Sequence, residues 1–233
     1  MKTSTLPLLL AIAVGLATSI ISDSAQANIT PASIAWGPAT NISGDTDVST
    51  LGTRVAAFNL SDSAGAQPAV VNGVQFDPFG ITGNPTNVTV DNFGLSESPG
   101  FLQGSSNFGS PTPPYVTLSP SYQTLLESAA YASNPPTLTL TMSALSIGQQ
   151  YQFEWWTNDS SHLNYTTTAT AVNSVSLSDN TTNAQGGIGQ FAIGTFTASA
   201  TNHTIAFSGT LGEPTINAFE LRAVSMIDLN YST

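Results

Sequence analysis

The chain of 233 residues contains no cysteine, which excludes a disulfide framework and thiolate chemistry. Positive charge is nearly absent as well. Three Lys and Arg residues face 14 Asp and Glu residues, for a formal net charge of −11. Because nucleic acids and anionic membrane surfaces are bound by clustered Lys and Arg, we expect neither as a partner. Hydrophobic residues make up 40% of the chain, so the composition is not that of a disordered protein.

Recognisable catalytic motifs are also missing. The sequence has no Gly-x-Ser-x-Gly elbow and no His-Glu-x-x-His or Cys/His cluster. We therefore predict no catalytic residues, no zinc site and no enzyme activity. Glu154 and Glu220 could meet on neighbouring strands, with Arg222 pairing with either. Two facing carboxylates can hydrolyse glycosides, but the pattern favours a cross-strand salt bridge on a solvent-facing sheet surface.

The first 27 residues resemble an export signal. Lys2 supplies a positive start, residues 6–21 form an apolar run, and Ala25-Gln26-Ala27 fits a signal-peptidase site. We expect cleavage after Ala27 and a secreted, extracellular protein without a membrane span. Export without disulfides is more typical of bacteria than of eukaryotes. Residues 28–233 are then long enough for a single β-sandwich domain.

Apolar and polar residues alternate with a period of two through most of this region, which predicts β-strands. Turn signals separate the strands, and many short strands at this spacing favour a sandwich or barrel. The expected strands are Arg54–Leu60, Ala69–Phe76, Asn87–Phe93, Thr137–Met142, Gln150–Thr157, Thr166–Leu177, Gly189–Ala198, His203–Ser208 and Ile216–Val224. Because Asn72-Gly73 favours a type I′ turn, residues 69–76 could instead form a tight hairpin.

One helix is predicted after Ser119-Pro120, which fits an N-cap followed by the first helical position. An apolar stripe then extends from Tyr122 to Ala130, and Asn134-Pro135-Pro136 ends it. Residues 94–114 are rich in Gly, Ser and Pro and are expected to form a long loop. The predicted fold class is therefore all-β, an antiparallel sandwich with one short amphipathic helix.

Several strand and turn segments together resemble a family of uncharacterised secreted bacterial proteins. The segments are residues 34–39, 44–50, 71–76, 145–151, 193–197 and 216–222. Members of this family often end in a C-terminal surface-sorting segment. The resemblance implies a jelly roll similar to galactose-binding and malectin-like carbohydrate modules. This chain ends at Asp228–Thr233 without such a segment, which favours release or assembly into a matrix over anchoring.

The strongest candidate for a sugar site lies on the expected strand at residues 150–157. Gln152, Glu154 and Trp156 would share one face of this strand. An exposed indole stacks on the C–H face of a sugar ring, while Gln and Glu hydrogen-bond its hydroxyls. The alternative is that a loop or the helix covers Trp156, because tryptophan is mostly buried.

The loop that follows this strand adds three candidate sugar contacts, which are Asp159, His162 and Tyr165. Loops at sandwich ends often carry ligand sites, although turn formation alone would explain Asp159. Asp45 and Asp47 could supply oxygen ligands for calcium in a second loop. A solvated turn is the simpler reading of that pair.

Two functional hypotheses follow. The first is a non-catalytic, carbohydrate-binding or adhesive protein of the cell surface or extracellular matrix, with a glycan or polysaccharide as its partner. The second is a structural subunit of an extracellular fibre or matrix that self-assembles by strand exchange. In the second, Asn28–Pro38 would be the donor strand, because cleavage frees it and it carries Ile34 and Trp36. The alternative for that segment is an ordinary first strand of its own domain.

Overall fold

A computed structural model describes residues 33–98, 100–132, 137–161 and 165–225. The predicted signal segment and its cleavage site, together with His162 and residues 226–233, lie outside these residues. Within the described part, no helix is both long and apolar enough to cross a membrane.

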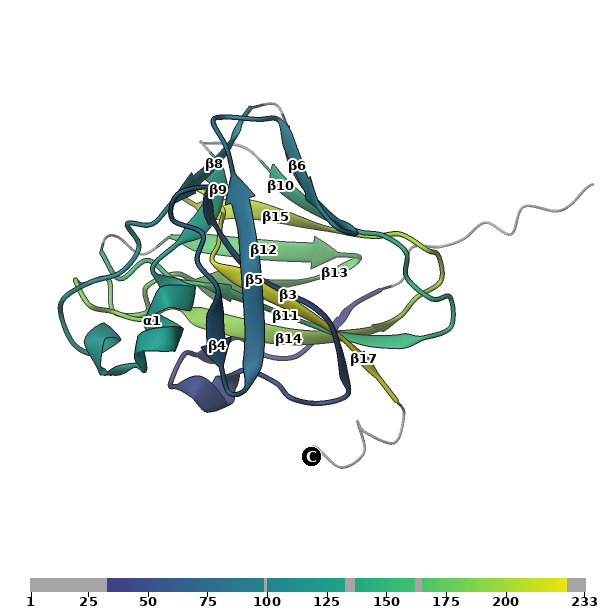
Figure 1. The fold of residues 1–233 in the computed structure, drawn as a ribbon, viewed down its shortest axis with the longest axis horizontal. Coiled ribbons are helices and arrows are strands. Elements are labelled where there is room, and N and C mark those ends of the chain that lie inside the picture. The colour runs from purple at the N-terminus through teal and green to yellow at the C-terminus, as the bar shows by residue number, and fades with distance from the viewer. Residues whose placement is uncertain (1–32, 99, 133–136, 162–164, 226–233) are drawn as a thin grey trace, which may run out of the picture.

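The described residues form an all-β sandwich, as the alternating pattern predicts (Figure 1). The eight-stranded sheet has the order β1-β14-β11-β17-β3-β5-β4, with β2 paired to β14. Its strands are β1 (Ala35–Trp36), β2 (Thr40–Asn41), β3 (Thr53–Asp62), β4 (Ala69–Val71), β5 (Val74–Ile81), β11 (Gln150–Thr157), β14 (Gln190–Thr197) and β17 (Ala218–Val224). Pairing is antiparallel except between β3 and β5, which run parallel.

The second layer is a six-stranded antiparallel sheet with the order β13-β12-β15-β10-β7-β6. Its strands are β6 (Asn87–Val90), β7 (Phe93–Ser98), β10 (Thr137–Met142), β12 (Thr166–Ala171), β13 (Asn173–Ser178) and β15 (His203–Leu211). A three-stranded sheet is formed by β8 (Leu102–Ser105), β9 (Ala129–Ala132) and β16 (Thr215–Ile216). Helix α1 (Pro120–Leu126) is the one α-helix of the described residues, beside the short 3₁₀ turns Asp45–Asp47 and Tyr115–Thr117.

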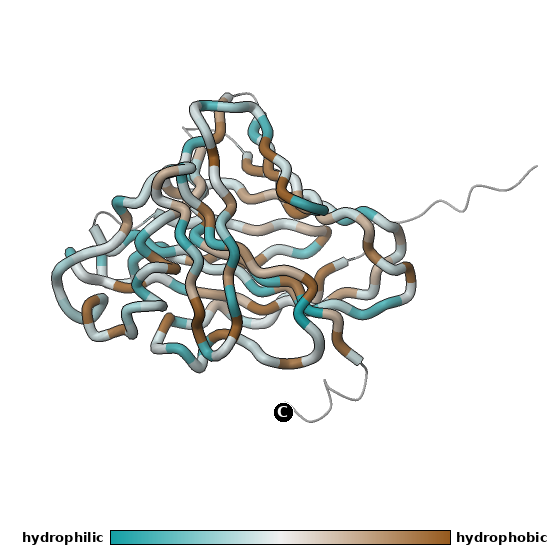
Figure 2. The backbone as a smooth tube through the Cα atoms, viewed as in Figure 1, coloured by the Kyte–Doolittle hydropathy of each residue, from teal (hydrophilic) through white to brown (hydrophobic). Residues whose placement is uncertain are grey.

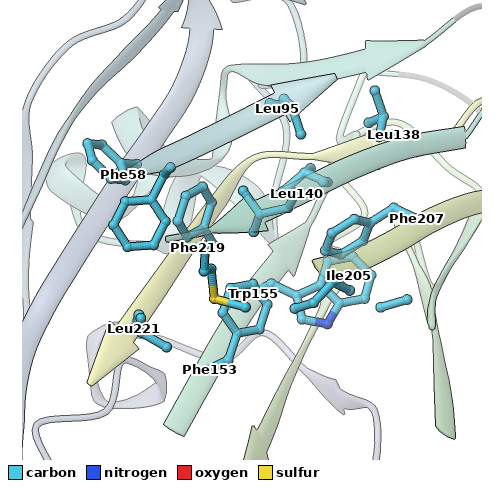
Figure 3. Close-up of a cluster of buried hydrophobic side chains, with 14 of the residues drawn as sticks. Phe58, Leu95, Leu138, Leu140, Phe153, Trp155, Ile205, Phe207, Phe219 and Leu221 are labelled. Carbon is cyan, nitrogen blue, oxygen red and sulfur yellow. The ribbon is translucent and has the colours of Figure 1, made fainter. Parts of the chain in front are cut away.

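The main core lies between the two large sheets. Both layers direct every second side chain inward, and hydrophobic and polar residues alternate along the tube in Figure 2. Figure 3 shows the centre of this core, formed by Phe58, Leu95, Leu138, Leu140, Phe153, Trp155, Ile205, Phe207, Phe219 and Leu221. The rings make edge-to-face contacts such as Trp155 with Phe207, whose centroids are 4.9 Å apart. Interleaved rings of this kind exclude water and fix the spacing of the sheets.

A second core covers the outer face of the eight-stranded sheet. Helix α1 and strand β4 lie side by side over this face (Figure 1). Tyr122, Leu125 and Leu126 of the helix pack with Trp156 and Phe76 of the sheet. Strand β11 is consequently buried on both faces over nearly its full length. A strand with two buried faces does not expose alternating polar residues. The predicted sugar site on β11 is therefore covered.

Several expectations about local structure are wrong. The strand expected at 87–93 is a hairpin of β6 and β7, which turns at Asp91 with a positive φ of 52°. Helix α1 ends at Leu126 rather than near residue 130, because residues 129–132 pair as β9 with β8 and β16. Residues 94–114 hold most of β7 and all of β8, where a loop is predicted. The single strand expected at 166–177 is two strands, β12 and β13, which turn at Val172 with a positive φ of 68°. For β7, β8 and β9, pairing with strands elsewhere in the chain overrides the local pattern, whereas β12 and β13 form a hairpin with each other.

The Asn72-Gly73 turn is confirmed as a hairpin between β4 and β5. Both residues have positive φ, 48° and 75°, as a type I′ turn requires. The Asn72 amide also donates a hydrogen bond of 2.8 Å to the carbonyl of Val48. This contact ties the turn to the loop that crosses the outer face of the sheet.

The described part of the proposed donor strand packs within its own chain. Strand β1 pairs with β14, and the backbone N–H of Ile34 donates to Ala171 in the other sheet. Ile34 is fully buried in the main core. Residues 33–36 therefore close the sandwich between β13 and β14 as an ordinary first strand.

The left-handed turn gives a prediction with a matched control. Replacing Gly73 by Ala adds a Cβ that meets no atom within 4 Å, so only its φ of +75° opposes the change. We expect a loss of about 1 kcal/mol in the free energy of unfolding, measured by urea titration. Gly44→Ala is the control, because it is equally uncrowded but has extended backbone, with φ of 164°. Equal losses in the two variants would contradict this explanation.

Candidate functional site

Trp156 is completely buried, so the predicted sugar platform is wrong in this structure. Its ring stacks on Phe191 and makes an edge contact with Phe76, and its Nε1 donates a 2.9 Å hydrogen bond to the Tyr122 hydroxyl. Gln152 and Glu154 are 4% and 1% exposed and lie on the same face. The residues expected to bind sugar instead form the packed interface under helix α1 and the neighbouring loop, the reading in which Trp156 is covered.

Glu154 and Glu220 stand directly opposite each other on β11 and β17, as expected. Arg222 forms an ion pair with Glu220 and donates further hydrogen bonds to the carbonyls of Thr50, Leu51 and Gly52. The expected solvent-facing location is wrong, because the two glutamates are 1% and 0% exposed. Residues 49–52 cover them, so neither carboxylate reaches a substrate in this structure. The pair instead holds the covering loop onto the sheet.

Asp45 and Asp47, the pair considered for calcium in the sequence, lie in the 3₁₀ turn just before this covering loop. Asp47 accepts hydrogen bonds from the backbone of Ser43 and Gly44, from the Ser43 hydroxyl and from Tyr122. The Asp45 carboxylate accepts a 2.6 Å hydrogen bond from Ser119, the N-cap of α1. Protein donors thus occupy both carboxylates. Among the described residues, no group of three or more His, Cys, Asp or Glu side chains is placed to hold a metal, and calcium gains no support here.

Burial dominates the electrostatics of the glutamate pair. It raises the pKa of Glu154 well above the ordinary carboxyl value, against the lowering effect of a hydrogen bond from the Ser49 N–H. Burial also raises the pKa of Glu220, although Arg222 opposes the shift. Glu154 Oε1, Glu220 Oε2 and Gln152 Nε2 are buried without a hydrogen-bond partner in the described residues. We infer that burial favours the neutral, protonated form of Glu154 and that Glu220 is the partner of Arg222.

This assignment predicts opposite outcomes for two similar substitutions. Glu154 keeps its proton in the folded state, so its stabilising contribution is present below the unfolded pKa and is lost as pH rises through the raised folded pKa. Glu154→Gln retains an acceptor for Ser49 and has no proton to lose. We therefore expect its free energy of unfolding to match the wild type near pH 4 and to exceed it near pH 9, in urea titrations.

Glu220→Gln is the matched variant. It leaves Arg222 buried without its ion-pair partner, and we expect a loss of about 3 kcal/mol at neutral pH, a typical cost of breaking a buried pair. If both variants lose stability equally, or if Glu154→Gln is the more damaging near pH 9, the protonation assignment is wrong.

A buried amide network joins the loops at one end of the sandwich. Asn217 lies between β16 and β17, and its Nδ2 donates to the carbonyls of Leu126, Ser128 and Asn158 at 2.8–3.1 Å. Its Oδ1 accepts from the Asn158 N–H at 2.6 Å. The Asn158 amide in turn donates to the Phe108 carbonyl and accepts from the Gly189 N–H. Both side chains are fully buried.

Removing the Asn217 amide should be costly. In Asn217→Ala the Ser128 carbonyl and the Asn158 N–H lose their partners without gaining water, at about 1–3 kcal/mol for each group. We expect a loss of at least about 3 kcal/mol in urea unfolding. Asn87→Ala is the control, because the exposed Asn87 amide bonds only to Thr86; its effect should be below about 0.5 kcal/mol. A loss below about 1 kcal/mol in Asn217→Ala would contradict the role of the network.

A cleft opens above this network, and it is the best candidate for a ligand site. Its volume is about 310 Å³, and residues from four separate segments line it. The lining consists of Ser105, Asn107, Phe108, Tyr131, Asp159, Ser161, Tyr165 and Glu213. Two of the predicted sugar contacts, Asp159 and Tyr165, therefore meet in the cleft, whereas Gln152, Glu154 and Trp156 lie elsewhere.

Aromatic rings and oxygen atoms are combined in this cleft. Phe108 and Tyr131 meet edge to face, with centroids 5.9 Å apart, and both rings are partly exposed. The Tyr165 ring is packed against Gly212, where a Cβ would come within 2.2 Å of it. Partial burial and the nearby Glu213 carboxylate raise the pKa of Tyr131. Its hydroxyl therefore stays protonated and can donate a hydrogen bond.

Hydrogen bonds fix the polar wall of the cleft. Asp159 accepts from the backbone N–H and the hydroxyl of Ser161, at 2.9 and 2.7 Å. Behind it, Asp179 accepts a 2.7 Å hydrogen bond from the Tyr165 N–H. Burial, reinforced by the charge of Asp159, raises the pKa of Asp179 to about 8. Asp179 is thus largely neutral at pH 7 and supports the wall without adding negative charge.

Six of the eight residues that line the cleft are not among the predicted site residues, and Phe108, Tyr131 and Glu213 are three of them. Phe108 lies in the segment expected to be a long loop, Tyr131 lies near the end of the expected helix, and Glu213 lies in an expected turn. The pairing of β8 with β9 brings the two segments together, and beyond β8 the Phe108 N–H donates to the Glu127 carbonyl ahead of β9. An aromatic residue within a Gly/Ser-rich stretch was the one local signal that could have indicated Phe108.

Comparisons of the chain with protein-family models, curated proteins and solved structures find no match. The functional argument therefore rests on the geometry of the cleft.

Proposed function

We propose that this protein is a secreted, non-catalytic carbohydrate-binding protein and that the cleft around Phe108 and Tyr131 holds the sugar. The supporting observation is the joining of two partly exposed aromatic rings with carboxylate, amide and hydroxyl groups in one hollow. Sugars need this combination, because their C–H faces pack on rings while their hydroxyl groups require hydrogen-bond partners.

The polar residues of the cleft suit a neutral sugar. Asp159 offers acceptor sites, and the Ser105 hydroxyl can both donate and accept. No Lys or Arg lines the cleft, which gives an anionic sugar no counter-charge. A volume of about 310 Å³ is small among ligand pockets, which span ~300–1,000 Å³, and fits one or two sugar units.

A second hollow continues from the cleft and favours an oligosaccharide over a single sugar. It has a volume of about 380 Å³ and shares Asn107 with the cleft. Tyr115, Gln123 and Glu127 contribute to its lining. A chain bound across Asn107 would occupy both hollows.

The alternative function, a fibre subunit joined by strand exchange, has less support. Residues 33–38 already pair within their own chain, so the fold does not need a donor strand from a neighbour. A neighbouring copy could make the same contacts only by displacing this segment.

The proposal is tested by the binding of neutral glycans on an array, followed by titration of the best ligand. Tyr131→Ala removes a ring face from the cleft and should weaken binding about tenfold, equivalent to roughly 1.4 kcal/mol. Tyr131→Phe retains the ring and should lose less. Phe101→Ala is the control, because Phe101 is 54% exposed but does not line the cleft.

Each variant is first compared with the wild type by thermal unfolding, so that lost binding is not mistaken for lost folding. The proposal fails if the wild type binds no neutral glycan. It also fails if Phe101→Ala weakens binding as much as Tyr131→Ala does.

A further inference from the structure

The outer face of the six-stranded sheet carries an ordered array of hydroxyl groups. Strands β10, β15 and β12 are neighbours in this sheet (Figure 1). Their inward residues are apolar or buried, and their outward residues are nearly all Thr or Ser. We call the following set the hydroxyl face: Thr137, Thr139 and Thr141 on β10, Thr204, Ala206 and Ser208 on β15, and Thr168 and Thr170 on β12.

These residues stand in register across the strands. Thr137 lies opposite Ser208, which lies opposite Thr168. In the next row Thr139 lies opposite Ala206, which lies opposite Thr170. Neighbouring strands are about 4.8 Å apart, and alternate residues along a strand are about 6.8 Å apart. The face is therefore a two-dimensional net of side chains that lacks a hydroxyl at Ala206 and, in the third row of Thr141 and Thr204, a member on β12.

Most of the hydroxyl face is free for a ligand, although the Thr168 hydroxyl is hydrogen-bonded to Ser176 at 2.8 Å. All eight of its residues are partly or fully exposed. Within the described part of the chain, the hydroxyls of Thr139, Thr141 and Thr204 form no hydrogen bond to other protein groups. Threonine is stiff about χ1, so each methyl and hydroxyl pair is held in a limited set of orientations before binding. Little conformational entropy would be lost when these groups meet an ordered surface.

The chemistry of the hydroxyl face limits the kinds of partner that it can bind. It carries no charged group for an ion, none of the Trp, Tyr or Arg anchors that dominate protein interfaces, and no aromatic ring for sugar stacking. What remains is a repeated spacing of methyl and hydroxyl groups, which recognises a partner that is itself a lattice. Oxygen atoms on faces of hexagonal ice repeat in two directions with spacings of this size.

We propose that the hydroxyl face binds ice, with the threonine methyls and hydroxyls ordering water into positions that continue the crystal. Adjacent strands are rotated by roughly 20–25°, so the match is confined to the three central strands. This activity is independent of the cleft, which lies at the loop end of the sandwich and uses aromatic rings.

The test measures the gap between the melting and freezing temperatures of a single ice crystal in a solution of the purified protein, and the shape of the crystal within that gap. The wild type should open such a gap and produce faceted crystals. Thr139→Lys places a long, strongly hydrated chain in the central row and should abolish most of the gap. Thr197→Lys, at an exposed threonine of β14 in the other sheet, is the matched control and should keep it.

A gain-of-function variant guards against misinterpreting a folding defect. Ala206→Thr fills the interruption in the central row and should widen the gap relative to the wild type. Tyr131→Ala, which tests the cleft, should leave the gap unchanged, so the two proposals fail separately. The ice proposal is overturned if the wild type shows no gap at high protein concentration, or if both lysine variants lose it equally. Binding to powdered crystalline polysaccharide that Thr139→Lys abolishes, without an effect on ice, would also overturn it.

Discussion

The buried amides of Asn158 and Asn217 are the contact on which the loop end of the sandwich depends. They satisfy carbonyl and N–H groups from the end of helix α1, the start of β9 and the loops at residues 108 and 189. None of these groups is paired by a regular strand ladder at this point, and each would be costly to bury alone. The same network holds Phe108 in position through its carbonyl. The packing beneath the cleft therefore fixes the geometry of the cleft.

A second constraint is that the eight-stranded sheet is covered on both faces. One face meets the other sheet, and the opposite face meets helix α1, the β4–β5 hairpin and the loop at residues 42–52. This coverage converts polar residues of β11 and β17 into buried groups. Glu154, Glu220 and Arg222 then act as an internal clamp for the covering loop, and the cost of their desolvation is met by one ion pair, several carbonyl contacts and a retained proton.

Two parts of the surface therefore offer different chemical groups for binding. The six-stranded sheet has only its inner face covered, and its outer face displays small hydroxyl side chains in register. The loop end collects the exposed aromatic rings and carboxylates. A chain with almost no Lys or Arg has few means of binding an anionic partner by charge. Its two candidate surfaces accordingly use ring stacking with neutral hydrogen bonds in one place and a repeated hydroxyl lattice in the other.

The sequence by itself determined the layered β architecture, because alternation with a period of two leaves little choice of which side chains face the core. It also indicated the Asn72-Gly73 hairpin, whose residues tolerate positive φ. Only the tertiary structure decided which faces were covered. The local pattern around Trp156 is the same whether solvent or helix α1 lies above it, and the pairing of β8 with β9 joins Phe108 to Tyr131 across segments whose own sequences predict a loop and a helix. Burial and strand pairing depend on residues far away in the chain, which no local periodicity records.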